Sequence, residues 1–298
     1  HSSYLYNINT PIHLELQKIA AQSLRNGLIA YDSRKGWRGP LKNIKYSKNW
    51  IDKIEKSFRL EKYIGWQIAI VKKVNQFNAT IETENNLIGI IEYKDISWTK
   101  KDFENLIKKG DVIYVKKINK EFFSLEQLPK INGGAVVMDP FTGRVLALSG
   151  GFSFRNSEFN RVSQALRQPG SAFKPFVYTV ALENQYTPSS LVLDAPLVLD
   201  QGIDLKKWKP ENYGKKFYGP STLRVGLEKS RNLMTVRIAQ NLGVDKIANF
   251  SKKMNIYKQP DELLSISLGS AETTLLSLTS AYCSFVNGGK LIKPILID

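Results

Sequence analysis

The spacing of apolar residues divides the chain into three zones. In residues 1–62, apolar side chains recur about every 3.6 positions after Thr10-Pro11, which predicts an amphipathic helix. The stripe consists of Leu14, Leu16, Ile19, Ala20, Leu24 and Leu28. Residues 31–40 are polar and rich in turn formers, so we expect a helical linker region in this zone.

Residues 63–128 change to the alternation of apolar and polar positions that is typical of β-strands. Short runs of this kind, separated by turn-forming residues, lie at 66–70, 79–83, 87–91 and 112–115. A helical stretch lies near 102–108. Several short strands with one helix favour a small Greek-key barrel of the OB type.

Residues 129–298 begin with two β-rich runs, 134–139 and 144–148, which predict a hairpin. Helical patterns follow at 172–185, 222–242, 244–254 and 272–286, with Gly243 and Gly288 expected to end helices. We expect later strands to complete the sheet that the hairpin begins. The predicted fold class is α+β and multidomain, with a helical linker in 1–62, the barrel in 63–128 and a domain of mixed helix and sheet in 129–298.

Composition limits the possible chemistry. The chain has 298 residues, one cysteine, two histidines and a net charge of +16, of which residues 1–130 carry +9 and residues 131–298 carry +7. The single Cys283 excludes an internal disulfide, and His1 and His13 lie outside the third zone, so we expect neither a Ser-His-Asp triad there nor a histidine-ligated zinc site. Diffuse positive charge suits nucleic acid, anionic lipid or cell-wall polymer without choosing among them.

Two further patterns do not occur in the chain. No apolar run reaches the roughly 20 residues that a membrane-spanning helix needs. No glycine-rich phosphate loop of the G-x-x-x-x-G-K-[ST] form is found, which argues against nucleotide hydrolysis.

The best candidate for catalysis is a serine and a lysine in the third zone. Ser171 follows a Pro-Gly turn at a predicted helix start, and Lys174 stands one turn later on the same side. A serine hydroxyl becomes a good nucleophile when a neighbouring base removes its proton, and a neutral lysine is such a base. Because lysine titrates near pH 10.4, its pKa must be lowered by burial or by nearby cations. The competing interpretation of Ser171 is a helix N-cap.

A second motif, Ser230-Arg-Asn232, offers a hydroxyl that can relay a proton and an amide that can orient a substrate. Each motif alone is unspecific. Ser97-Trp-Thr-Lys100 repeats the first, and Ser47-Lys-Asn49 repeats the second. We interpret the copy at Ser97 as a loop without chemistry.

Together the two motifs resemble the S-x-x-K and S-x-N motifs of penicillin-binding proteins and serine β-lactamases. The stretches that resemble the transpeptidase domain of class A penicillin-binding proteins are Gly134-Ala-Val-Val-Met-Asp-Pro-Phe-Thr-Gly-Arg-Val145, Arg167-Gln-Pro-Gly-Ser-Ala-Phe-Lys-Pro-Phe176, Pro210-Glu-Asn-Tyr213, Gly219-Pro-Ser-Thr-Leu-Arg224 and Leu268-Gly-Ser-Ala-Glu-Thr-Thr274. Residues 16–40 resemble the stretch after the glycosyltransferase domain in the 1A type, which carries an OB-like insert where residues 63–128 lie.

The resemblance implies a serine β-lactamase-like transpeptidase domain and assigns roles by position. Ser171 is implied to be the acylated nucleophile, Lys174 its general base, Ser230 a proton relay to the leaving amine and Asn232 an amide that holds the substrate. The implied reaction is D,D-transpeptidation of peptidoglycan stem peptides through a serine acyl-enzyme, with D-Ala-D-Ala carboxypeptidase activity as a variant. It needs no metal and no organic cofactor.

The resemblance further implies that Asn212 and Tyr213 contact the substrate. The implied partners are peptidoglycan stem peptides, the lipid-linked precursor, β-lactam antibiotics and a periplasmic regulator bound through residues 63–128, whereas nucleic acid is not an expected partner. It also implies a longer parent protein, with a glycosyltransferase domain and a single-pass anchor, at the periplasmic face of the inner membrane.

One family motif is missing from the chain. The third motif, Lys-[Ser/Thr]-Gly on a strand, does not occur in the 298 residues. That strand is implied to supply the second oxyanion donor, and the loss of one such donor slows reactions by about 10²–10³. We therefore expect this chain by itself to be a weak or inactive acylation catalyst derived from an active parent.

Two other functions stay open on the sequence alone. A β-lactam hydrolase shares the serine and the lysine, and rapid nitrocefin turnover would favour it. A basic OB-fold module that binds nucleic acid or protein is the second alternative. Salt-dependent nucleic-acid binding that survives deletion of residues 131–298 would support that module.

Overall fold

The computed structural model describes residues 8–199 and 207–298, so His1 lies outside the described residues. The chain forms two compact units. Unit 1 contains Met138–Val145, the described residues of Ser163–Asp298 and the few residues before Ile12; unit 2 contains Ile12–Val137 and Leu146–Val162. Within the described ranges, none of the helices combines the length and the apolar character that crossing a membrane requires.

Unit 2 begins with α1, Leu14–Ser33, which confirms the helix predicted from the apolar stripe. The stripe is only partly buried, because Leu28 lies in the core whereas Leu14 is exposed. Gln17 fixes the helix against β8, Val145–Ser149: its amide donates to Leu148 O at 2.9 Å, and its carbonyl accepts from Leu148 N at 2.8 Å. One side chain thereby satisfies two backbone groups of the strand.

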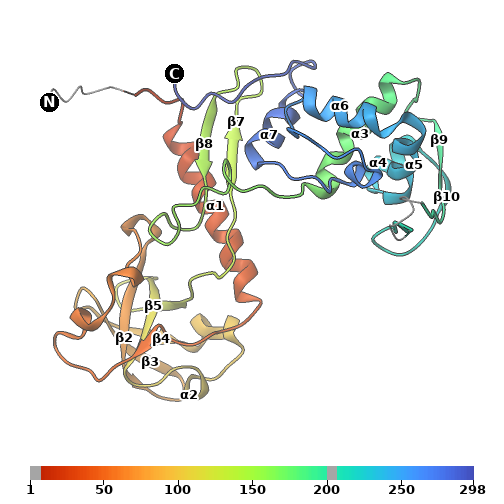
Figure 1. Cartoon of the computed structure of the whole chain (residues 1–298). Helices are drawn as coiled ribbons and strands as arrows, with labels where there is room; N and C mark the ends of the chain where they lie inside the picture. Colours follow the sequence, from red (N-terminus) through yellow and green to blue (C-terminus); the bar gives the residue numbers. More distant parts are fainter. Residues whose placement is uncertain (1–7, 200–206) are drawn as a thin grey trace. The chain divides into compact units, whose positions relative to one another are not determined.

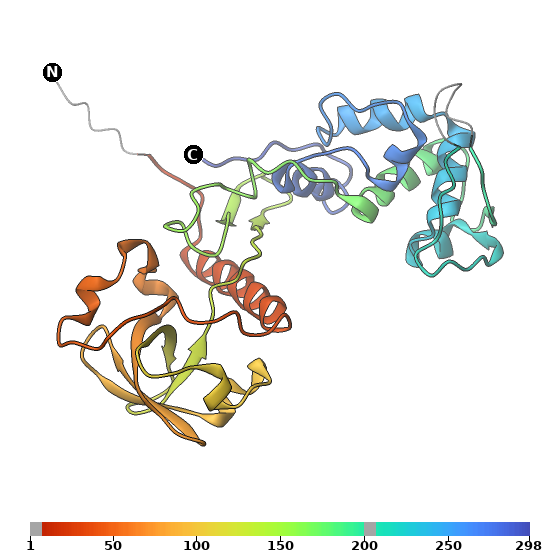
Figure 2. The same cartoon turned by 60° about the horizontal axis from the view of Figure 1, so that its bottom comes forward.

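The sheet of unit 2 forms the OB-like barrel predicted from the alternation (Figure 1). Its strands are β1 Lys42–Asn43, β2 Trp66–Val74, β3 Asn78–Thr83, β4 Ile88–Glu92, β5 Asp111–Lys117 and β6 Phe123–Glu126. They run antiparallel in the order β1-β5-β2-β3-β4, and β6 pairs with β5. Figure 2 gives a second view of these orange-to-yellow strands, which curve around one core.

The barrel core consists mainly of side chains from the strands and from two short helices, and it includes Ile81, Ile91, Phe103, Ile113 and Phe123. The short helices of unit 2 are η1 Trp50–Lys53, η2 Lys56–Phe58, η3 Lys62–Ile64, η4 Tyr93–Thr99 and α2 Phe103–Leu106. Ser97 lies in η4 rather than in the predicted loop. Its hydroxyl donates to Lys94 O at 2.9 Å, so the serine of this S-x-x-K copy stabilises its own helical turn.

The strands β7, Ala135–Met138, and β8 confirm the predicted hairpin. The expectation that later strands complete its sheet is wrong for the described residues. The strands β9, Leu191–Asp194, and β10, Gly219–Thr222, pair with each other instead. The hairpin gains one parallel bridge, between Arg144 and Ile295.

Unit 1 is otherwise helical. Its helices are η5 Gly170–Phe173, α3 Lys174–Glu183, α4 Leu223–Glu228, α5 Asn232–Leu242, α6 Val244–Lys253, η6 Leu264–Leu268 and α7 Leu275–Cys283. The buried faces of α3 and α5 supply Phe176, Val177, Met234 and Ile238 to one core. That core supports the start of α3, where the candidate lysine lies.

Two predicted helix limits are wrong. The helix predicted over 222–242 is interrupted between α4 and α5, where Ser230 has a left-handed φ of 51°. Likewise α7 ends at Cys283 rather than at Gly288. Tighter turns continue the apolar pattern past that end, since Val286 N donates to Cys283 O at 3.0 Å. Gly243 follows α5, as predicted.

Candidate active site

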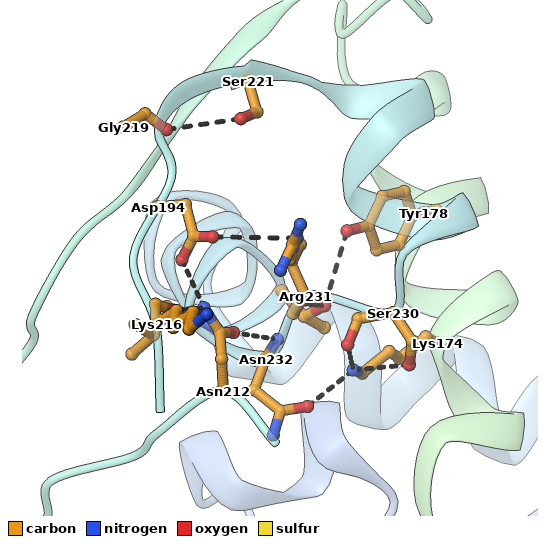
Figure 3. Close-up of polar contacts among 12 residues, drawn as sticks. Lys174, Tyr178, Asp194, Asn212, Lys216, Gly219, Ser221, Ser230, Arg231 and Asn232 are labelled. Carbon is orange, nitrogen blue, oxygen red and sulfur yellow. Dashed lines mark hydrogen bonds and ion pairs between the residues drawn. The ribbon is translucent and has the colours of Figure 1, made fainter. Parts of the chain in front are cut away.

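Lys174 is the first residue of α3, and only 1% of its surface is exposed. Its Nζ lies 2.7 Å from Ser230 O, 3.0 Å from Ser230 Oγ and 2.6 Å from Asn232 Oδ1 (Figure 3). Three residues that the sequence predicted to be catalytic therefore meet at one nitrogen, although 56 positions separate Lys174 from Ser230.

Burial lowers the pKa of Lys174 to about 8. At pH 7 this pKa leaves roughly one lysine in ten neutral, whereas an ordinary lysine is neutral in fewer than about one in a thousand molecules. Ser230 O and Asn232 Oδ1 can only accept hydrogen bonds. In the neutral amine, the two N–H bonds can serve these two oxygens, which leaves the lone pair to accept a proton. This arrangement suits a general base.

Ser171 lies in η5, one turn before Lys174, and its side chain is exposed. The N-cap of η5 is Pro169, and no side chain caps α3, so the interpretation of Ser171 as a helix N-cap is wrong. Within residues 8–199 and 207–298, the Ser171 hydroxyl has no hydrogen-bond partner. This exposed hydroxyl, one helical turn before a buried base of lowered pKa, is accessible to a ligand.

The turn that carries Ser171 is held from two sides. Gly170 N donates to Gly269 O at 3.1 Å, and a Cβ on Gly269 would overlap the backbone of Gly170. On the other side, the Tyr282 hydroxyl donates to Ala172 O at 2.6 Å. The nucleophile candidate is therefore positioned by the end of η6 and by α7.

Ser230 has a backbone conformation that few residues other than glycine adopt. Ser230 N donates to Leu227 O at 3.0 Å, and Arg231 N donates to Gly226 O at 2.9 Å, which closes the end of α4. In this conformation both the carbonyl and the hydroxyl of Ser230 contact Lys174. The unfavourable backbone angle thus coincides with both contacts to Lys174.

Asn232 begins α5, and its side chain is fixed at both ends. Its Oδ1 accepts from Lys174, and its Nδ2 donates to Glu211 O at 2.8 Å. Its backbone N–H donates to Asn212 Oδ1 at 2.9 Å.

Asn212 and Tyr213 have very different surroundings. Asn212 is buried, and its Oδ1 accepts from Asn232 N and Leu233 N, so it caps the first turn of α5. Tyr213 is fully exposed. The contact of these two residues with substrate stays a prediction.

The sequence prediction missed two charged residues behind the site. Asp194, at the end of β9, is completely buried and accepts from Asn212 Nδ2 at 2.7 Å. Arg231 Nε lies 3.8 Å from Asp194 Oδ2, and the Arg231 guanidinium lies 3.3 Å from the ring centre of Tyr218. The sequence carried no clear signal for Asp194: Val192 and Asp194 occupy the inward positions of β9, but the outward positions are the leucines 191 and 193, so the run does not alternate.

Metal chemistry has no candidate residues in the described ranges. Among residues 8–199 and 207–298, no group of three or more His, Cys, Asp or Glu side chains is placed to hold a metal ion.

Two family models match the chain. Residues 133–298 match the penicillin binding protein transpeptidase domain, and residues 37–131 match the penicillin-binding protein OB-like domain. The OB-like match coincides with the barrel, and the transpeptidase match contains Lys174.

Curated relatives are similar over nearly the whole chain. Penicillin-binding protein 1A of Rickettsia bellii is 41% identical over 294 residues, and the protein of the same name from Pseudomonas aeruginosa is 34% identical over 311 residues. Each alignment covers 98% of this chain and 37% of the relative. The chain thus spans little more than a third of the length of these relatives.

A solved structure is similar over the same extent. The crystal structure of penicillin-binding protein 1A from Haemophilus influenzae matches with a TM-score of 0.87 and 32% identity, covering 98% of this chain and 44% of that chain.

Proposed function

The chain belongs to the penicillin-binding protein transpeptidase family, and on this basis we propose that it is the D,D-transpeptidase part of a longer peptidoglycan synthase. Its predicted fold class, a transpeptidase domain preceded by an OB-like barrel, is confirmed by both family matches and by the solved structure. The observation that carries the proposal is the buried Lys174, of lowered pKa, one turn after the exposed Ser171 and bonded to Ser230 and Asn232.

In the first half-reaction, Ser171 Oγ attacks the carbonyl carbon of the D-Ala-D-Ala amide. Its hydroxyl rotates toward the neutral Lys174 amine and gives up its proton to Nζ as the carbon–oxygen bond forms. The tetrahedral intermediate then expels D-alanine. Ser230 passes the proton from Lys174 to the leaving nitrogen, which leaves an ester on Ser171 and a neutral lysine.

In the second half-reaction, an amine of a neighbouring stem peptide attacks the ester. Its proton goes to Lys174, the ester bond breaks, and Ser171 Oγ recovers a proton. A water molecule in place of the amine gives carboxypeptidation. The Asn232 amide is proposed to hold the peptide, with Asn212 and Tyr213 as further candidate contacts. A β-lactam amide would acylate the same serine.

Labelling with a fluorescent penicillin tests the nucleophile. We expect the longer parent to take one label per chain on Ser171, as seen by intact mass and peptide mapping, and this chain to take the label slowly or not at all. Ser171→Ala is expected to abolish the label. Ser97→Ala, which alters the second S-x-x-K copy, is the matched control and is expected to keep it. A label that survives Ser171→Ala, or a parent protein that takes none, contradicts the proposal.

The wider setting is also proposed. Because the curated relatives are much longer than this chain, we propose that the parent carries a peptidoglycan glycosyltransferase domain and a single-pass anchor and works at the periplasmic face of the inner membrane. Its partners would be stem peptides, the lipid-linked precursor and a regulator bound through residues 63–128.

The family assignment favours transpeptidation over the two alternatives. Residues 37–131 match an OB-like domain of penicillin-binding proteins, which favours the envelope setting over nucleic-acid binding. A β-lactam hydrolase requires fast deacylation, so rapid nitrocefin turnover would reverse the choice.

A further inference from the structure

A line of hydrogen bonds connects the buried carboxylate of Asp194 to Lys174 through two asparagine side chains (Figure 3). Asp194 Oδ1 accepts from Asn212 Nδ2 at 2.7 Å. Asn212 Oδ1 accepts from Asn232 N at 2.9 Å, and Asn232 Oδ1 accepts from Lys174 Nζ at 2.6 Å. Each member lies on a different element or loop, so the line joins β9, the 207–218 segment, α5 and α3.

The direction of each bond is fixed by chemistry. A carboxylate only accepts, so Asp194 selects the rotamer of Asn212 that presents its NH₂ group. The Asn212 carbonyl oxygen must then face the first turn of α5, where the N–H groups of Asn232 and Leu233 lack helical partners. Lys216 O also accepts from Asn212 Nδ2, at 2.9 Å, but the bond to the Asp194 carboxylate is charge-assisted and therefore the stronger of the two.

The orientation of Asn232 is constrained in turn. Its backbone is held by Asn212, and its Nδ2 is held by Glu211 O. With both of these groups held, the Asn232 Oδ1 atom is oriented toward Lys174 Nζ. We propose that Asp194 is a positioning residue of the transpeptidase site: through Asn212 it orients Asn232, and thereby fixes an acceptor on the Lys174 amine. This inference rests on the proposed function but uses no substrate.

The other charged groups around the line are few. Arg231 lies beside Asp194 at 3.8 Å and stacks on Tyr218. Tyr178 bonds Thr235 at 3.4 Å, and burial raises its pKa to about 12, so it stays neutral in the working range. Burial is the cause of the lowered Lys174 pKa, and the Asn232 acceptor acts against it by favouring the ammonium form.

Titration of Lys174 tests the proposal without acylation. With ¹³C-lysine labelling, NMR follows the Lys174 side chain against pH, and Lys174→Arg identifies its signal. Asp194→Ala is expected to release Asn232 and to lower the Lys174 midpoint by about one pKa unit, the size expected for loss of a charge-assisted hydrogen bond. Asp194→Asn keeps an oxygen acceptor and is expected to restore the wild-type midpoint.

Two further variants complete the test. Asn212→Ala breaks the same line of hydrogen bonds at its second residue and is expected to lower the Lys174 midpoint by the same amount. This variant provides the test if Asp194→Ala does not fold. Asp111→Ala is the matched control, because Asp111 in the barrel is also buried and accepts from Asn43 Nδ2 at 2.6 Å; it is expected to leave Lys174 unchanged. A midpoint that stays constant or rises in the folded Asp194 and Asn212 alanine variants, or that falls equally in Asp111→Ala, overturns the proposal. A longer parent that takes no penicillin label would reject the proposed function, and the Lys174 titration would still show whether Asp194 positions Asn232.

Discussion

Ser230 combines a structural cost with two contacts to the candidate base. Its φ of 51° is uncommon for a residue with a Cβ, and the same angle presents its carbonyl and hydroxyl to Lys174. The backbone contact and the hydroxyl contact can be separated by substitution, because only the hydroxyl depends on the side chain.

We predict that Ser230→Gly is more stable than Ser230→Ala by about 1 kcal/mol, since glycine adopts the left-handed region without steric cost. Both variants lose the hydroxyl, so both are expected to acylate the parent's Ser171 at least about 100-fold more slowly. Urea unfolding and penicillin labelling measure the two effects. Equal stability of the two variants would contradict the account of backbone strain.

The lowered pKa of Lys174 makes a prediction about stability and pH. The folded value of about 8 lies below the ordinary value near 10.4, so between these pH values the unfolded chain binds the extra proton. The free energy of unfolding is therefore expected to rise with pH across this window, by up to about 3 kcal/mol from this group.

The comparison with Lys174→Met isolates the lysine from the other groups that titrate in this range. The difference in unfolding free energy, wild type minus variant, is expected to increase between pH 8 and pH 10 in urea titrations. Parallel pH profiles for the two proteins would show that Lys174 has an ordinary pKa.

At the scale of residues, the sequence predicted the parts of the site that short spacing reveals. Ser171 and Lys174 are three positions apart, and Ser230 and Asn232 two, so each pair forms a recognisable motif. Asp194 was missed because its partner Asn212 lies 18 positions away and nothing local joins them. Long-range hydrogen bonds between unlike elements leave no periodic signal.

At the scale of elements, the close approach of η6 to η5 determines where the nucleophile candidate lies. Gly269 has φ of 73°, and the position of its missing Cβ is occupied by the backbone of Gly170. Gly288 has a similar φ of 77° but open space around it. Substitutions at the two glycines therefore separate the free-energy cost of a left-handed backbone from the cost of the steric contact with Gly170.

We predict that Gly269→Ala displaces the turn that carries Ser171 and slows penicillin labelling of the parent by at least about tenfold, with a loss of stability above about 2 kcal/mol. Gly288→Ala is expected to cost only about 1 kcal/mol, from its backbone conformation, and to label normally. Labelling rates and thermal unfolding provide the comparison. Identical behaviour of both variants would rule out the role of the contact.

The interrupted helix shows why element limits were harder to predict than element types. The helix predicted over 222–242 runs across five polar residues, 228–232, that separate Leu227 from Leu233. The break lies within this polar run, where Ser230 has a left-handed backbone. The strands β9 and β10 were missed because each has only 4 residues, too few for a clear alternation.

At the scale of the whole molecule, each unit has a hydrophobic core of its own. Phe123 is fully buried in the barrel core of unit 2, and Phe176 is almost fully buried in the core of unit 1. Separate cores are typical of domains that unfold independently. The predicted limits 1–62, 63–128 and 129–298 stay a prediction, and β1 at Lys42–Asn43 already belongs to the barrel sheet.

We predict that Phe123→Ala destabilises unit 2 by about 3–5 kcal/mol and leaves unit 1 intact. Hydrogen exchange read by mass spectrometry is expected to accelerate in β2–β6 and to stay unchanged in α3 and α5. Phe176→Ala is the reciprocal control and is expected to show the opposite pattern. Acceleration in both units from either substitution would mean that the chain unfolds as one body.

The way in which the barrel sheet curves has a consequence for self-association. Outer strands with free N–H and C=O groups act as templates that recruit other chains into aggregates. Here a bridge links Ile90 of β4 to Phe122, just before β6, and Ile90 N donates to Glu121 O at 2.8 Å, so two strands that would otherwise be open partly satisfy each other. This pairing leaves fewer free backbone groups on β4 for the strand addition that leads to aggregation.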